Sequence, residues 1–430
     1  MNDSHLTGSE IRQLIETDNT ATQTKLLLHH LAVCPDCYAE GGYILDLHLA
    51  GALPERFSSV DIDLAKSRAD APGLYAKLSR FGFKRQQGLL RDTRRFRSWG
   101  LAELLCAESL TAAARDPEKA VQLAELAVLL ASKLGEWEPA EEAWLCLLRS
   151  YAWAHLGNAR RVLGELRSAE EAFARSSQWW EAAESMGDVL DYEAMILALK
   201  ASLRRTQGRF AEALSFLDEA LALPSASAIR SAILASRAFT LGEAGDLKTA
   251  AGAFREAIAA TDRTGAPRLY YILHHNLLDA LSKAGRIEEA ASLLPEVAAL
   301  ARETGEEIDL LRFEWLEARI AAKAGDSGGA MERLDRVRTL LLHRGLAFDA
   351  ALATLELMHL YLLEGVLDAV EALAGDLLAI FEAQGVPREA LATLTVFCRA
   401  AKAKLATAEL AEATLEAMEG MRRKLASGVD

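Results

Sequence analysis

Residues that break helices or cross-link chains are scarce in this sequence. Its 430 residues include 9 prolines and 5 cysteines, and 7% are aromatic. Scarce proline together with abundant Ala, Leu and Glu favours helix, so we predict an all-α protein. The cysteines are too few and too scattered for a disulfide framework, which fits a reducing cytoplasm. Three of them, Cys106, Cys146 and Cys398, lie inside apolar helical patterns typical of small core residues.

The sequence also lacks a long apolar run and an excess of positive charge. No uncharged apolar stretch of about 18 residues occurs, and the polar N-terminus has no apolar core of a signal peptide. The net charge is −14, which opposes general binding to nucleic acid. We therefore expect a cytoplasmic protein that neither contacts a membrane nor binds nucleic acid directly.

One short stretch carries a metal-binding pattern. His30, Cys34 and Cys37 stand at H-x3-C-x2-C spacing, and His5 can supply a fourth ligand. Two imidazoles and two thiolates form a closed tetrahedral set for a structural Zn2+ ion. Pro35 ends the preceding helix and suits the first turn of the next, where a helix N-terminus lowers thiol pKa values. The spacing from His30 to Cys34 is about one helical turn, so both side chains can face the same ion.

Three alternatives to this zinc site are open. The C-x-x-C could be a chance pattern accompanied by core histidines. It could also be a redox dithiol, although no strand precedes it as a thioredoxin-like site would require. Finally, His29 could replace His30 as a ligand, but the four-residue spacing to Cys34 favours His30.

These residues resemble the zinc-containing anti-sigma factor domain of bacteria, in which an early His is followed by a helix ending in H-x3-C-x2-C. Here His5 to Glu10, Thr24 to Val33 and Cys34 to Cys37 follow that pattern. The resemblance covers about residues 1–85, and residues 1–45 are its specific part. It implies a domain that packs onto an extracytoplasmic-function-type sigma factor and blocks its access to RNA polymerase. Redox-responsive members tend to carry Cys at the early ligand position, so His5 argues against thiol-based sensing.

The sequence divides into three segments. We predict a zinc-binding helical domain over residues 1–85, a basic connecting segment over 86–100 and a repeat solenoid over 101–430. Residues 84–97 carry six basic side chains against one acid. They favour a solvated helix face, or a surface that docks on acidic repeats or an acidic partner. A nucleic-acid patch is a weaker alternative because no recognisable motif accompanies the charge.

From about residue 101 the pattern Gly-x4-Ala-x3-Leu/Phe-x2-Ala repeats. Its glycines follow one another at intervals of 44, 37, 40, 40 and 40 residues. They are Gly164, Gly208, Gly245, Gly285, Gly325 and Gly365. An interval of about 40 residues fits two helices of four turns or more, and the pattern resembles long-helix tetratricopeptide repeats of bacterial transcription regulators. With a degenerate first copy at Asp116 we count seven copies, followed by a degenerate, polar capping unit over residues 388–425.

No catalytic constellation is present. The sequence has no Gly-rich phosphate loop, no G-x-S-x-G and no HExxH, so we expect no enzyme activity. Counting back from the turn glycines puts five residues at offsets that usually line the concave groove of such an array. They are His275, Asp279, Trp315, Arg319 and His359. A groove for a peptide or protein is one interpretation. Ordinary solenoid surface and helix packing is the other, because the common peptide-clamping Lys and Asn are absent.

Two functional hypotheses follow from these segments. In the first, the zinc domain binds a sigma factor and the repeats sense a partner protein or peptide that changes this affinity. In the second, the zinc domain is a structural cap and the array is a scaffold for a complex unrelated to transcription. An adjacent sigma-factor gene in the same transcription unit would favour the first hypothesis.

The zinc hypothesis predicts a local effect for the loss of one ligand. Cys34→Ser should remove the bound Zn2+, unfold residues 1–50 and abolish partner binding, yet barely change the helical content. The reason is that the stability of a solenoid is a sum of terms between neighbouring repeats. Metal analysis and circular dichroism of the variant and the intact chain check this. Melting of the whole chain in the variant would show that the division into two modules is wrong.

Overall fold

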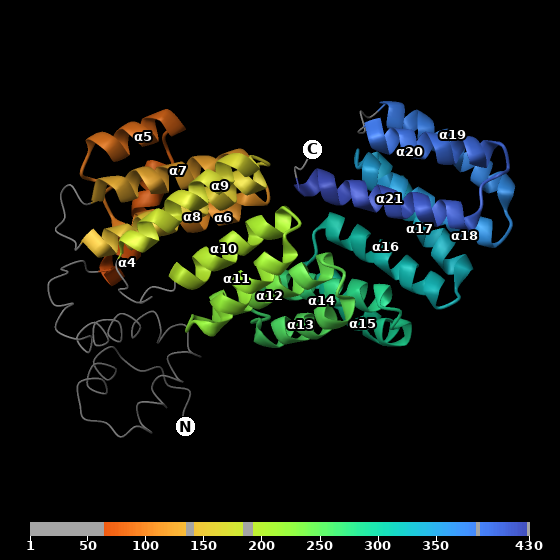
Figure 1. The fold of residues 1–430 in the computed structure, drawn as a ribbon, viewed down its shortest axis with the longest axis horizontal. Helices are drawn as coiled ribbons and strands as arrows, with labels where there is room; N and C mark the ends of the chain where they lie inside the picture. The colour runs from red at the N-terminus through yellow and green to blue at the C-terminus, as the bar shows by residue number, and fades with distance from the viewer. Residues whose placement is uncertain (1–63, 135–141, 184–191, 384–387, 428–430) are drawn as a thin grey trace, which may run out of the picture. The chain divides into compact units, whose positions relative to one another are not determined.

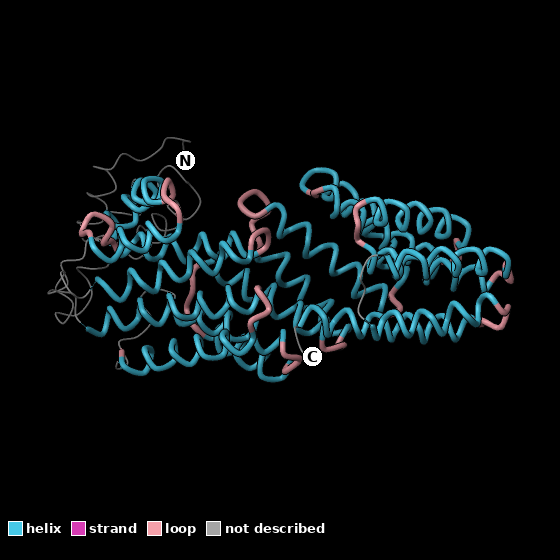
Figure 2. The backbone as a smooth tube through the Cα atoms, turned by 90° about the horizontal axis from the view of Figure 1, so that it is seen from above, coloured by secondary structure: helices cyan, strands magenta, loops and turns pink. Residues whose placement is uncertain are grey.

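The fold is known from a computed structural model that describes residues 64–134, 142–183, 192–383 and 388–427. These ranges contain eighteen α-helices and no β-strand (Figure 2). The prediction of an all-α chain is therefore confirmed for the part that the structure describes. The four predicted zinc ligands lie in residues 1–63, outside the described residues, so the zinc-binding domain stays a prediction.

The described helices belong to two compact units, residues 1–187 and 188–430. Figure 1 labels the helices of both. The helices of the first unit are α4 (Leu64–Leu78), α5 (Phe83–Asp92), α6 (Trp99–Ala113), α7 (Pro117–Leu134), α8 (Glu142–Val162) and α9 (Leu166–Ala182). Helices α6 to α9 form two consecutive antiparallel pairs, and α4 and α5 pack against α6 and α7.

Helices α4 and α6 approach each other so closely that backbone atoms of both helices take part in the contact. The Gly100 N–H donates to the Ser67 hydroxyl at 2.9 Å, and Ser67 lies 2.9 Å from the Ser98 hydroxyl. A Cβ at Gly100 would stand 2.3 Å from the Ser67 carbonyl oxygen, so only glycine allows this approach. At the surface Arg68 donates two hydrogen bonds to Glu103, at 2.7 and 2.9 Å. Helix α4 is thereby joined to the first pair of the array.

The second unit continues the pairing through six helical hairpins. Its helices are α10 (Tyr192–Thr206), α11 (Phe210–Ala222), α12 (Ser227–Glu243), α13 (Leu247–Ala260), α14 (Pro267–Lys283), α15 (Ile287–Thr304), α16 (Glu307–Lys323), α17 (Ser327–His343), α18 (Ala347–Leu363), α19 (Leu367–Ala383), α20 (Arg388–Lys402) and α21 (Ala408–Ser427). Each helix from α10 to α18 packs on the next one along the chain. The predicted repeat array is confirmed in this unit.

The turn inside each pair explains the repeated glycine. All six predicted glycines have φ between +71° and +94°, the left-handed region that side chains with a Cβ disfavour. In five of the six copies an Ala follows five residues later and is fully buried, where it lets the two helices of a pair approach closely. These alanines are Ala169, Ala213, Ala250, Ala290 and Ala330. The sequence pattern did not predict Gly345, which also has a positive φ and joins α17 to α18 between two pairs.

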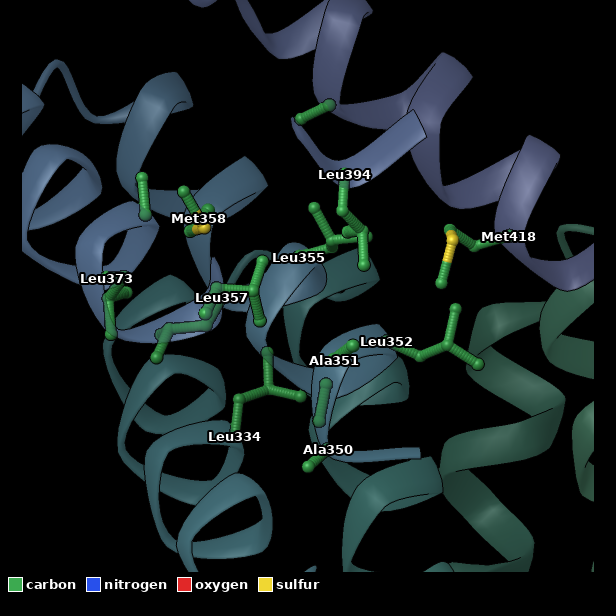
Figure 3. Packing of buried hydrophobic residues seen from close by; sticks show 14 of the residues in the cluster. Leu334, Ala350, Ala351, Leu352, Leu355, Leu357, Met358, Leu373, Leu394 and Met418 are labelled. Carbon is green, nitrogen blue, oxygen red and sulfur yellow. The ribbon is translucent and has the colours of Figure 1, made fainter. Parts of the chain in front are cut away.

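The end of the second unit departs from the regular array. Helix α21 packs against α18 more extensively than against its own pair partner α20. In Figure 3 Leu352 of α18 points toward Met418 of α21, while Leu357 lies on the side of Leu334 and Leu373. Helix α18 is therefore apolar around most of its circumference, unlike a surface helix with one buried face.

The predicted polar cap is present on the outer side of this last unit, with one exception. Its charged residues include Lys402, Lys404, Glu409, Glu412, Glu416 and Glu419, and the first five of these six are exposed. The sixth, Glu419, is half-buried and faces Arg319 of α16. In the turn before α21, Lys404 takes the place of the usual glycine with a φ of 58°. None of the described helices combines the length and the apolar character needed to cross a membrane.

The turn glycines lead to a paired prediction. Gly245→Ala should lower the stability of the second unit by about 1–2 kcal/mol, because alanine is strained at the positive φ of this turn although no atom opposes its Cβ. Gly252→Ala, inside α13 and equally unopposed, should raise it by about 0.5–1 kcal/mol. Urea unfolding midpoints of the two variants measure the difference. Equal shifts in the same direction would contradict the role given to the turn conformation.

Candidate functional site

Nothing among the described residues suggests a metal centre. No group of three or more His, Cys, Asp or Glu side chains in these ranges is placed to hold an ion. Cys106, Cys146 and Cys398 are buried and free, as predicted for core residues. Burial raises the pKa of the Cys106 thiol well above its ordinary value, with a smaller contribution from Glu103. This thiol therefore does not ionise readily and behaves as an apolar core residue.

The five residues predicted to line a groove lie on the first helices of three consecutive pairs. His275 and Asp279 belong to α14, Trp315 and Arg319 to α16, and His359 to α18. All five therefore lie on the first helix of their pair. Their environments differ, and they form two neighbouring groups.

The first group is centred on the carboxylate of Glu356 in α18. The Trp315 indole N–H donates to it at 2.9 Å, and the Arg319 Nε donates to both carboxylate oxygens, at 3.0 and 2.9 Å. The Arg319 guanidinium also stands over the Trp315 ring, 4.6 Å from its centre. The Glu356 side chain is 14% exposed and that of Arg319 is 25% exposed. Since both charges are largely withdrawn from water and paired, the arrangement is rigid and its charge nearly neutralised.

The second group lies on α14 and the C-terminal half of α16. Burial lowers the pKa of His275, and the nearby Asp279 carboxylate opposes this shift. Asp279 accepts a hydrogen bond from Lys283 at 2.7 Å. The Lys323 ammonium donates to the Ser282 carbonyl at 2.9 Å, and burial lowers its pKa. This group therefore combines a buried imidazole with the Asp279 carboxylate and two lysine side chains.

Sequence reasoning missed the partner residues, although the repeat interval contains a signal for them. Trp315 and Arg319 bond to Glu356, which follows them by 41 and 37 residues. Tyr271 donates to the Asp309 carbonyl at 3.0 Å across 38 residues, and Lys323 bonds to Ser282 across 41. These separations match the repeat interval of about 40, because one interval joins equivalent positions on neighbouring first helices. A search for complementary side chains one repeat apart would have found Glu356.

The chain itself covers part of this face. The His359 Nδ1 atom lies 3.1 Å from the carbonyl oxygen of Ala408, at the start of α21. Near the other end of α21, a Glu419 carboxylate oxygen lies 3.8 Å from the Arg319 guanidinium. Trp315 is itself 95% buried, so its indole packs in the core more than it faces a groove. Helix α18 therefore makes most of the contact with α21, and α16 adds Arg319 beside it.

The first unit contains a basic surface and one hollow. In the basic segment of residues 84–97, five side chains are exposed, and Arg97 is half-buried. The exposed ones are Lys84, Arg85, Arg91, Arg94 and Arg95. Part of the segment is helix α5, where Arg85 stacks on the Phe81 ring at 4.8 Å. A pocket of about 440 Å³ lies between α8 and α9 beside Trp153 and Arg160, and none of the five predicted groove residues lines it.

Comparison with known proteins relates the fold to helical repeat proteins. No protein-family model matches the chain, and no curated protein matches its sequence. A solved structure of a Rap protein complexed with competence and sporulation factor superimposes with a TM-score of 0.51 at 13% identity, covering 76% of this chain and 89% of that chain. This likeness shows a tetratricopeptide-like all-helical repeat array.

Two other solved structures match over much of the chain. Aspartyl phosphate phosphatase F from Bacillus subtilis gives a TM-score of 0.46 at 12% identity, covering 90% of this chain and 98% of that chain. A signal transduction ATPase with numerous domains from Pyrococcus horikoshii, which has a tetratricopeptide repeat sensor, gives 0.49 at 12% identity. That match covers 96% of this chain and 72% of that chain.

The pairing at Glu356 leads to a stability prediction. Glu356→Ala should destabilise the second unit by about 1–3 kcal/mol, because it leaves the Trp315 indole and the Arg319 guanidinium without their acceptor. Glu356→Gln should lose less, since an amide oxygen can still accept from Trp315. Glu256→Ala, on the exposed side of α13, should stay within about 0.5 kcal/mol of the intact chain. Urea unfolding checks this, and similar losses for Glu356→Ala and Glu256→Ala would refute the role of the cluster.

Proposed function

We propose that this chain is a cytoplasmic transcription regulator that acts by binding proteins at two places. The repeat array binds a partner protein or peptide on the face of α14, α16 and α18. The N-terminal segment binds an extracytoplasmic-function-type sigma factor through a domain held together by Zn2+. Binding at the array changes the affinity for the sigma factor.

The observation that supports the array's role is the arrangement of its first helices. Three consecutive pairs carry partly exposed charged or imidazole side chains on their first helices, and α21 already rests on α18 beside Arg319 of α16. Such a surface suits the recognition of a helical or extended polypeptide. The solved Rap structure with a similar fold was obtained in complex with competence and sporulation factor, which agrees with a polypeptide ligand.

Binding without catalysis is part of the proposal. The charged groups of this face are engaged with one another, as Arg319 with Glu356 and Lys283 with Asp279. A catalytic acid, base or nucleophile would instead need a free side chain aimed at a reacting atom.

The N-terminal half of the proposal rests on the residues His5, His30, Cys34 and Cys37. Their spacing fits a tetrahedral Zn2+ site, and they match the pattern of the bacterial zinc-containing anti-sigma domain. In this setting the ion is structural: it fixes the helices that contact the sigma factor and takes no part in a reaction. A net charge of −14 supports a protein partner over nucleic acid.

Affinity capture with a pair of neighbouring histidine variants tests the proposal. The intact chain and His29→Ala should each bind about one zinc ion and capture the same identified sigma factor. His30→Ala should lose the zinc and the sigma factor, because His30 is the proposed ligand. Mass spectrometry of captured proteins and metal analysis of the purified chains provide the measurements. Capture of one partner set by all three chains, with no sigma factor in it, would instead support the scaffold hypothesis.

A further inference from the structure

We infer that the face of α18 beside Arg319 of α16 is a binding site for an amphipathic helix with a carboxylate next to its apolar stripe, and that α21 occupies this site as an intramolecular ligand. The partner of the array is then a helix of another protein with the same chemistry, which competes with α21. This inference names the ligand class for the array and rests on the proposed function only in assuming that the array has a partner.

The first support is the position of α21. In the regular part of the array each second helix packs between its own first helix and that of the next pair. Helix α21 instead turns back onto α18, which precedes its pair partner α20 by two helices. Figure 1 shows α21 next to α18. Its start, at Ala408, is near His359 at the end of α18, so the two helices run antiparallel. Geometrically, α21 occupies the place of a ligand on the first helices.

The second support is the face that α21 turns inward. Ala411, Thr414 and Met418 are buried at spacings of three and four residues, which form one stripe of a helix. The Thr414 hydroxyl donates to the Leu410 carbonyl at 2.7 Å, so the stripe contains no unsatisfied polar atom. Met418 belongs to the same apolar cluster as Leu352. Between the stripe positions Glu412, Ala413, Glu416 and Ala417 are exposed, whereas Leu415 is partly buried and packs against the same cluster.

The third support is a charge contact beside this stripe. Glu419 lies next to Met418 and places its carboxylate 3.8 Å from Arg319. Arg319 is already held by Glu356 and Trp315, which belong to α18 and α16. The receptor side is therefore organised by its own residues and does not depend on α21 for its charged group. A carboxylate from any helix placed there would meet the same guanidinium.

The connection before α21 keeps the helix tethered when it leaves α18. Residues 403–407 join it to α20, and Lys404 fixes that turn through an ion pair with Asp368 at 2.8 Å. A tethered segment acts at a high effective concentration, on the order of millimolar for a short linker. A partner helix must therefore bind more tightly than α21, and anything that weakens α21 docking should increase its apparent affinity.

Two neighbouring substitutions in the full-length chain test this inference. Met418→Asp puts a charge into the buried stripe, whereas Ala417→Asp puts the same charge on the exposed side one residue away. The probe is a fluorescent peptide of residues 406–427 with the natural sequence. It should bind Met418→Asp at least about tenfold more tightly than the intact chain or Ala417→Asp. Hydrogen exchange should show α21 deprotected in Met418→Asp alone, with α16 and α18 still protected.

A second pair of substitutions tests the charge contact between Glu419 and Arg319. Both lie at the surface and leave the core intact. Glu419→Lys in the peptide should weaken its binding to the Met418→Asp chain about fivefold, since it replaces attraction to Arg319 with repulsion. Glu416→Lys, an equal change of charge at an exposed position, should leave binding unchanged. If Met418→Asp does not fold, the same two substitutions are made in the full-length chain. The Glu419→Lys chain should then bind the natural peptide more tightly than the Glu416→Lys chain.

The results separate this inference from the proposed function. Release of α21 without any gain in peptide binding would overturn the inference, and so would loss of protection in α16 and α18 when α21 is released. Neither result involves the N-terminal segment or a sigma factor, so the proposed function would stand or fall by the capture experiment alone. Equal weakening by Glu419→Lys and Glu416→Lys would remove Arg319 from the recognition site.

Discussion

The structure depends on the close packing of two helices around a small residue. The pairs from α8–α9 to α16–α17 each have a buried Ala facing the partner helix and a turn glycine with a positive φ, and these bring the two backbones together. A pair built in this way still has an apolar face, which only a neighbouring pair can cover. The array therefore extends by repetition, and its last pair must deal with an uncovered face. Helix α21 packs its apolar stripe on α18, so the end of the array also covers part of the face of its first helices.

Polar contacts between repeats follow from the same regularity. Equivalent positions on neighbouring first helices are about 40 residues apart. Glu356 accepts hydrogen bonds from Trp315 and Arg319 across that interval. Buried ion pairs contribute little net stability compared with apolar packing, but a missing partner is costly. The cluster therefore fixes the relative position of α16 and α18 more than it strengthens the fold. A recognition site whose charged group is already held in place loses little entropy when a ligand binds.

Much of this fold could be predicted from the sequence because its signals are local. Glycine at 164, 208, 245, 285, 325 and 365 is required by the turn conformation, and each buried Ala follows at a fixed distance. The five groove candidates lie on first helices, as counting from the turn glycines indicated, and their role in a groove stays a prediction. The return of α21 was not predicted, because Lys404 replaces the glycine signal and because the choice of α18 over α20 depends on tertiary packing. Glu356 was missed because its partners are distant in sequence, and the zinc-binding domain stays a prediction.

Because α21 already occupies the face of α18, a partner helix must displace α21 in order to bind. The apparent affinity of the ligand is its intrinsic affinity multiplied by the fraction of chains in which α21 has left α18. A helix that has a similar apolar stripe but binds weakly therefore does not displace α21. A successful competitor needs contacts that α21 does not make. The second group of charged residues, around Asp279 and Lys323 on α14 and α16, offers such contacts farther along the same line of first helices. Because a ligand shifts an equilibrium only by its difference in affinity for the two states, a helix reaching both groups would displace α21 more effectively than one that only copies it.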